Sequence, residues 1–100
     1  MGDKINDMKE NKDSAYFVLV LKNYAQRRSI THQAISEKTG ISRPHLNRIF
    51  NLRYSPRTDM LFSIVKALDL DISIQDSNGG KDLEDAGKDA RLQLKEFNIW

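Results

Sequence analysis

The sequence contains no cysteine and no long hydrophobic run, and each absence excludes a class of protein. Without cysteine there is no disulfide framework, no thiolate metal site and no cysteine nucleophile. The longest apolar run, Ala15–Leu21, has seven residues, whereas a membrane-spanning helix needs ~20. The run ends in Lys22 with no signal-peptidase site behind it. We therefore expect a soluble, cytoplasmic protein that does not contact a membrane.

Glycine and histidine are too sparse for the common catalytic and metal sites. The single Gly-Gly pair, Gly79-Gly80, lies in a polar stretch, so there is no glycine-rich phosphate loop. His32 and His45 have no companion ligands at metal-binding spacing. We expect no enzyme, no metal or other cofactor, and no small-molecule substrate.

Positive charge and hydrophobic residues are concentrated in the middle of the chain. The whole sequence has 16 basic and 14 acidic side chains, a net charge of +2. Residues 14–74 hold nine of the basic and four of the acidic side chains, and 28 of the 39 hydrophobic residues. A core can form only there. We predict a flexible arm over residues 1–13, a folded domain over residues 14–76 and a flexible tail over residues 77–100.

Hydrophobic spacing and capping residues predict four helices in the folded domain, so the fold class is all-α. Thr31 and Ser42 are capping residues that precede the second and third helices. Gly40 suits the left-handed turn between these two helices. The expected helices cover about residues 15–28, 32–39, 43–51 and 58–68.

Residues 32–51 fit the frame of a helix-turn-helix. The small side chain of Ser36 lets the two helices approach, and Gly40 permits the turn. Apolar residues at the buried positions of the frame hold the second helix at a steep angle, so that it can enter a DNA groove. These residues are Ile35, Ile41, Leu46 and Ile49. Spacing alone leaves open a helical hairpin that does not bind DNA.

The outward face of the third predicted helix favours nucleic-acid binding. Arginine and asparagine read guanine and adenine in the major groove. This face presents Pro44, Asn47, Arg48 and Asn51, and Arg43 points forward from the N-terminal end of the helix. No acid occurs between residues 41 and 58, where four arginines stand: Arg43, Arg48, Arg53 and Arg57. The alternative is a solvated charged face without a ligand.

The stretch Thr31–Leu70 resembles the Cro/repressor-type (XRE) helix-turn-helix domain. The matching residues are ITHQAISEKTGISRPHLNRI and SPRTDMLFSIVKAL. The resemblance implies a small helical bundle, of four or five helices, that binds operator DNA as a dimer. By position it implies base reading by Arg43, Pro44, Asn47 and Arg48. It likewise implies phosphate contacts by Thr31, His32, Gln33, Asn51 and Arg53.

Three departures from that family are visible. The family usually has Gln where His32 stands, and Glu-Asn-Gly where Phe50-Asn51-Leu52 stands. An acid that normally pairs inside the bundle is thus replaced by a ring, and the loop glycine is lost. A strand pattern also follows the fourth helix, where phage repressors often add a fifth.

The strand pattern predicts a dimer. Leu70, Ile72 and Ile74 alternate with polar residues. A single short strand has no partner within the chain, so we expect it to pair with its copy in a second subunit about a two-fold axis. The alternative is an extended segment that packs without pairing.

The tail indicates a protein partner. Its apolar residues lie at helical spacing from Leu83 to Trp100, although residues 91–95 also alternate as an extended segment would. The ending contains Phe97, Ile99 and Trp100, and such side chains are common interface anchors. The order of bundle, strand, tail and terminal tryptophan is similar to HipB-type antitoxins, which repress their own operon and bind a HipA-type kinase toxin.

Three hypotheses follow from these patterns. The first is an antitoxin repressor that binds operator DNA and a HipA-type toxin, in the cytoplasm and on the nucleoid. The second is a stand-alone, phage-type regulator with no toxin partner. The third is a pure interaction protein whose helix-turn-helix serves only assembly.

Overall fold

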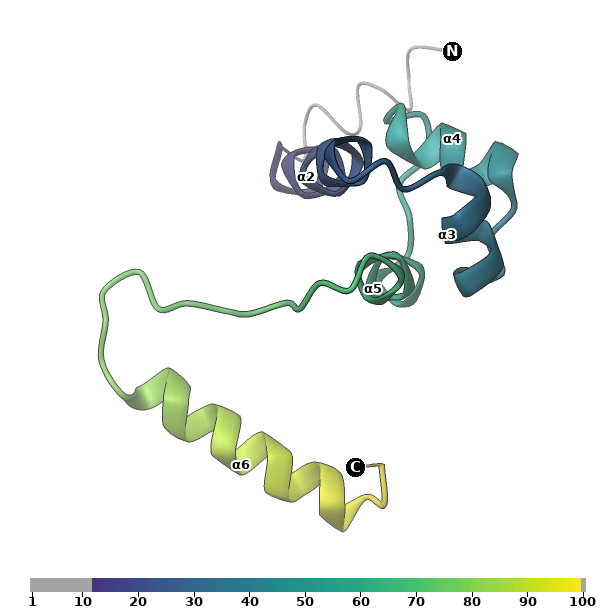
Figure 1. Ribbon diagram of the computed structural model, residues 1–100. Helices are drawn as coiled ribbons and strands as arrows, with labels where there is room; N and C mark the ends of the chain where they lie inside the picture. The colour runs from purple at the N-terminus through teal and green to yellow at the C-terminus, as the bar shows by residue number, and fades with distance from the viewer. Residues whose placement is uncertain (1–11, 100) are drawn as a thin grey trace.

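The computed structural model describes residues 12–99, which form five helices. Four of them gather into a bundle, and the fifth lies apart at the end of an extended segment (Figure 1). The helices are α2 (Lys12–Arg27), α3 (His32–Thr39), α4 (Arg43–Phe50), α5 (Thr58–Ala67) and α6 (Asp82–Glu96). The all-α prediction is confirmed. The predicted arm falls outside the described residues, apart from Lys12 and Asp13, which begin α2.

The bundle is held by one apolar core to which all four of its helices contribute. α3 packs against both α4 and α5, and α2 packs against α4. Burying a large aliphatic or aromatic side chain contributes about 1.5–3 kcal/mol. The largest buried side chains are Val18, Ile35, Leu46, Ile49, Phe50, Ile64 and Leu68. Those in α3, α4 and at the end of α5 are inward positions that helical spacing predicts, whereas in α2 the spacing predicts Val20, which is exposed, and misses Val18.

Local hydrogen bonds cap the first turns of α3 and α4 and fix the turn between the two helices. The Thr31 hydroxyl oxygen accepts a hydrogen bond from the Ala34 amide (3.0 Å), and the Ser42 hydroxyl oxygen accepts one from the His45 amide (3.3 Å). Gly40 has a φ of +79°, and its amide donates to the carbonyl of Ser36 (2.8 Å). The sequence predictions for both caps and for the turn are confirmed.

The predicted strand is absent among residues 12–99. Residues 70–76, called here the linker segment, contain neither helix nor strand. Leu70 packs against the core, whereas Ile74 is 78% exposed. A strand is defined by ladder hydrogen bonds to a neighbour, and no described segment of the single chain supplies one. The alternation of residues was therefore insufficient to produce a strand within one chain.

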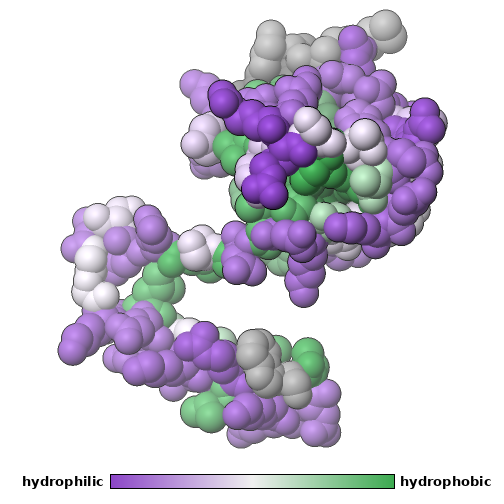
Figure 2. All heavy atoms as spheres, in the orientation of Figure 1, coloured by the Kyte–Doolittle hydropathy of each residue, from purple (hydrophilic) through white to green (hydrophobic). Residues whose placement is uncertain are grey.

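Most of the predicted flexible tail is helical. α6 begins after Gly79 and Gly80, which have φ values of +75° and +110°, and its first turn carries three acids that favour the helix dipole. None of its residues is buried. Figure 2 shows hydrophobic residues exposed along the segment that joins α6 to the bundle. Helical spacing from Leu83 onward thus prevailed over Gly87, whereas Gly79 and Gly80 lie in the turn before the helix.

Candidate nucleic-acid interface

α4 divides into a buried face and a polar outward face. Leu46, Ile49 and Phe50 are buried in the core. All four residues that the resemblance implies as base readers are exposed, as is Asn51 at the end of the helix. The exposed base-reading residues are Arg43, Pro44, Asn47 and Arg48. The structure therefore brings the predicted base readers together on one solvent-facing surface.

A chain of hydrogen bonds holds Arg43 at the start of α4. Its Nη1 donates to Oε1 of Gln33 (3.1 Å), and Nε2 of Gln33 donates to Oε2 of Glu37 (2.9 Å). All three side chains are exposed. Gln33 thus positions an arginine in addition to its implied phosphate contact. Sequence reasoning missed Glu37, although its i, i+4 spacing from Gln33 is a usable signal.

Asn47 is paired with Asn51 in the same way. Nδ2 of Asn51 donates to Oδ1 of Asn47 over 3.1 Å. Asparagine reads adenine with both its oxygen and its amide nitrogen. Because the amide oxygen of Asn47 has two lone pairs, it can accept from adenine while it still accepts from Asn51.

His32 and Phe50, which both depart from the family pattern, contact each other. Their ring centroids lie 5.3 Å apart with an interplanar angle of 39°. Phe50 is buried, and His32 is half-buried at the first position of α3. The aromatic pair thus occupies the site where the family usually has glutamine and an acid. A shallow hollow between α3 and α4 is lined by His32, Ser36, Ser42, Arg43, Pro44 and Asn47.

The loop after α4 extends the basic surface. Arg53 is exposed, and its backbone amide donates to the Arg48 carbonyl (2.8 Å). Leu52 takes the left-handed conformation (φ +59°) at the position where the family has glycine. The His45 and Tyr54 rings meet edge to face with centroids 4.5 Å apart, which ties the loop to α4.

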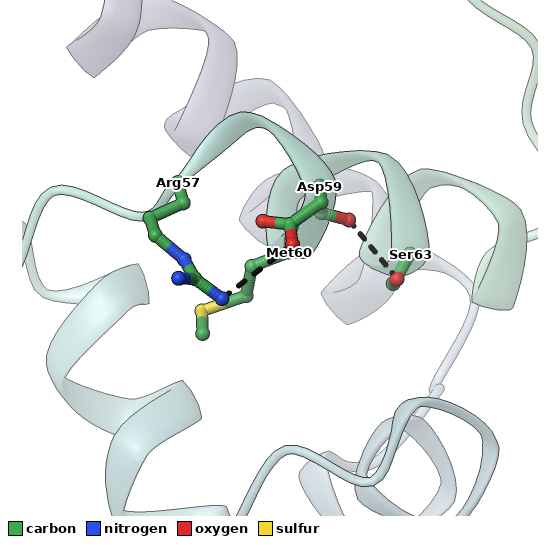
Figure 3. Close-up of polar contacts among 4 residues, drawn as sticks. All are labelled: Arg57, Asp59, Met60 and Ser63. Atoms are coloured by element: carbon green, nitrogen blue, oxygen red, sulfur yellow. Dashed lines mark hydrogen bonds and ion pairs between the residues drawn. The ribbon is translucent and has the colours of Figure 1, made fainter.

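Arg57 is the one arginine of this region whose charge is paired within residues 12–99. Its Nη2 lies 3.5 Å from Oδ2 of Asp59, and both side chains are exposed (Figure 3). Asp59 also accepts a hydrogen bond from the Met60 amide (2.8 Å). Over the same residues, Arg43, Arg48 and Arg53 have no carboxylate within ion-pair distance. Their charges are available to phosphates.

The remaining predicted sites lie away from this surface. Ile72 and Ile74 are exposed in the linker segment, and Phe97 and Ile99 are exposed after α6. Trp100 is outside the described residues. Within residues 12–99 no three metal-ligating side chains come together. No helix in that range is long and apolar enough to cross a membrane.

Comparison with known proteins identifies the domain. A profile of the helix-turn-helix family matches residues 21–75, more than half of the chain. The match contains α3, α4, α5 and the hydrogen-bonded residues described above. Neither the curated proteins nor the solved structures include a significant match.

Proposed function

Since the chain belongs to the XRE-type helix-turn-helix family, we propose that it is a non-enzymatic repressor that reads operator DNA with the outward face of α4. The observation that carries the proposal is an exposed arginine and asparagine surface on the helix that this fold projects into the major groove. A repressor of this kind acts in the cytoplasm, on the nucleoid.

Base reading and phosphate contact can be separated by substitution. Arg43→Ala is expected to cost ~1–3 kcal/mol on operator DNA and much less on unrelated duplexes. Arg53→Ala is expected to weaken all duplexes similarly and to reduce the salt slope by about 1, because it removes one phosphate contact. Fluorescence anisotropy with the DNA upstream of the gene and a scrambled duplex measures both effects. Equal losses for Arg43→Ala on the two duplexes would contradict its role in base reading.

We also propose that the protein is a homodimer joined through the linker segment. The backbone of residues 71–75 makes none of the backbone hydrogen bonds found elsewhere in the chain, and Ile72 and Ile74 alternate with polar residues. Beside it lies an apolar groove that includes Tyr16, Val20 and Val65. Pairing of two linker segments about a two-fold axis would satisfy the backbone groups and cover this groove.

Proline at the centre of the linker segment tests this dimer. Ile72→Pro removes a donor from the proposed ladder and should shift sedimentation from dimer to monomer. Ile72→Val, which keeps the donor, is the control. A proline variant that remains fully dimeric would exclude this interface.

We propose further that the protein is the antitoxin of a HipA-type kinase toxin, which its C-terminal end binds. The support is the similarity to HipB-type antitoxins and the exposure of Phe97 and Ile99, which are 73% and 70% exposed. Large apolar side chains that are exposed after a surface helix are suited to a groove on a partner, where such anchors can contribute 2 kcal/mol or more.

Truncation separates toxin binding from DNA binding. A chain lacking residues 96–100 should bind operator DNA as the full chain does, but bind a kinase encoded beside the gene at least about tenfold more weakly. Calorimetry with that kinase measures the loss. A neighbourhood without a kinase gene, or unchanged kinase binding, would favour the stand-alone regulator instead.

A further inference from the structure

The first half of α6, although apart from the bundle, lies across an open groove from the linker segment of its own chain (Figure 1). The two enclose an open groove with Ile72 and Ile74 on one side and Leu83, Gly87 and Arg91 on the other. Leu83 and Gly87 are half-buried there. Ile72 also lines the apolar groove beside α2. The apolar surface is thus continuous from the proposed dimer interface to α6.

The apolar stripe of α6 continues beyond the groove that α6 forms with the linker segment. Leu83, Gly87, Ala90 and Leu94 lie on one face of the helix by their spacing. The groove ends at Arg91. Leu94 is one turn beyond that residue and does not line the groove. Leu92 lies on the opposite side of the helix and is 60% exposed. The second half of the stripe therefore has no linker residue of its own chain against it.

The charges beside the stripe complement those of the linker segment. Residues 70–80 contain Asp71 and Asp76 and no basic residue. Arg91 borders the stripe and lines the groove, whereas Lys88 and Lys95 lie further round the helix, beside Leu92. Lys88 has a partner within the helix, Glu84, at 3.8 Å. Arg91 therefore stands on the edge that an acidic strand would approach.

We propose that the second half of the α6 stripe docks on the linker segment of a second copy of this chain. The inference rests on the proposed dimer. Two paired strands lie ~4.8 Å apart, whereas a helix is ~10 Å wide. A helix that rests on one linker segment therefore also covers the adjacent one. The two α6 helices then cover the two paired linker segments. A two-stranded sheet without such cover has only marginal stability in water.

A charge on each face of α6 tests this docking in the full-length protein. Leu94→Asp places a carboxylate in the stripe, and Leu92→Asp places the same carboxylate on the opposite face. We expect Leu94→Asp to raise the dimer dissociation constant at least about tenfold and Leu92→Asp to change it less than about threefold. Analytical ultracentrifugation measures the constants, and circular dichroism checks that α6 remains helical in both variants.

Cross-linking identifies what α6 contacts. Because the chain has no cysteine, Ile74→Cys in one chain and Leu94→Cys in a second, tagged chain introduce one thiol each. A disulfide between the two chains is expected, and Leu92→Cys should not form one. If Leu94→Asp dimerises like wild type and no cross-link forms, the docking proposal is wrong. The proposed pairing of the linker segments is still supported in that case if Ile72→Pro dissociates the dimer. A monomeric wild type would overturn both.

Discussion

At the scale of single residues, the proposed DNA-binding surface is shaped by side chains that position one another. Arg43 is held by Gln33, which in turn is held by Glu37. A carboxylate near a DNA surface repels phosphates, so Glu37 acts in two opposing ways. We expect its charge to lower the affinity for all DNA, while its hydrogen bond to Gln33 keeps Arg43 oriented.

Two substitutions of Glu37 separate these effects. Glu37→Gln removes the charge and keeps an acceptor, so it should strengthen binding to operator and scrambled duplexes alike. Glu37→Ala should strengthen binding to the scrambled duplex similarly but reduce the ratio of operator to scrambled affinity severalfold, because Gln33 loses its anchor. Anisotropy titrations at one salt concentration measure both. If the ratio of operator to scrambled affinity is the same for the two variants, Glu37 does not position Arg43.

The contact between His32 and Phe50 is a second residue-scale feature. Such ring pairs contribute about 0.5–1.5 kcal/mol beyond the area they bury. A double-mutant cycle with His32→Ala and Phe50→Leu should give a coupling of this size in urea unfolding. The cycle of Phe50→Leu with Glu84→Ala, on the distant α6, should give a coupling near zero. Equal couplings in the two cycles would show that the contact is not specific.

At the scale of elements, local chemistry explains which predictions from sequence succeeded. Each helix of the bundle has an apolar face, and α3 and α4 have their own caps, so these elements were predictable from neighbouring residues. The Gln33–Arg43 contact joins residues ten apart and depends on the angle between two helices, which spacing does not specify. The linker segment was predicted as a strand because alternation shows which side chains share a face, but it does not supply a pairing partner.

We expect alanine to have opposite effects on the free energy of unfolding at two glycines that differ in backbone conformation. Gly40 has φ +79° with no atom within 4 Å of an added Cβ, so Gly40→Ala strains the backbone alone and should cost ~1–2 kcal/mol of unfolding free energy. Gly87 lies within α6 and also has open space, so Gly87→Ala should increase helix content and contribute ~0.5–1 kcal/mol. Circular dichroism and urea unfolding test the pair. Stabilisation by Gly40→Ala would contradict the turn geometry.

At the scale of the whole molecule, the chain has a small core and large uncovered apolar surfaces. Eleven hydrophobic residues are buried, whereas eight large hydrophobic side chains are exposed among residues 12–99. Several of these line the grooves beside α2 and α6. A dimer that covers them links folding to association, so its stability depends on protein concentration.

Concentration dependence of unfolding tests this linkage. The thermal midpoint of the wild type should rise by several degrees between about 1 and 100 μM, because the dimer is favoured by mass action. The midpoint of Ile72→Pro should be lower and should not change over the same range. A wild-type midpoint that is independent of concentration would indicate that the bundle is stable as a monomer.

The central claim is that the outward face of α4 reads DNA sequence, and selection from random duplexes tests it most directly. The wild type should enrich a pseudo-palindrome whose half-sites are about one helical turn, ~34 Å, apart. Arg43→Ala and Asn47→Ala should each lose preference at a distinct position of each half-site, while Arg53→Ala should retain the whole consensus at lower affinity. No enriched sequence for the wild type, or an unchanged consensus for Arg43→Ala and Asn47→Ala, would contradict the claim.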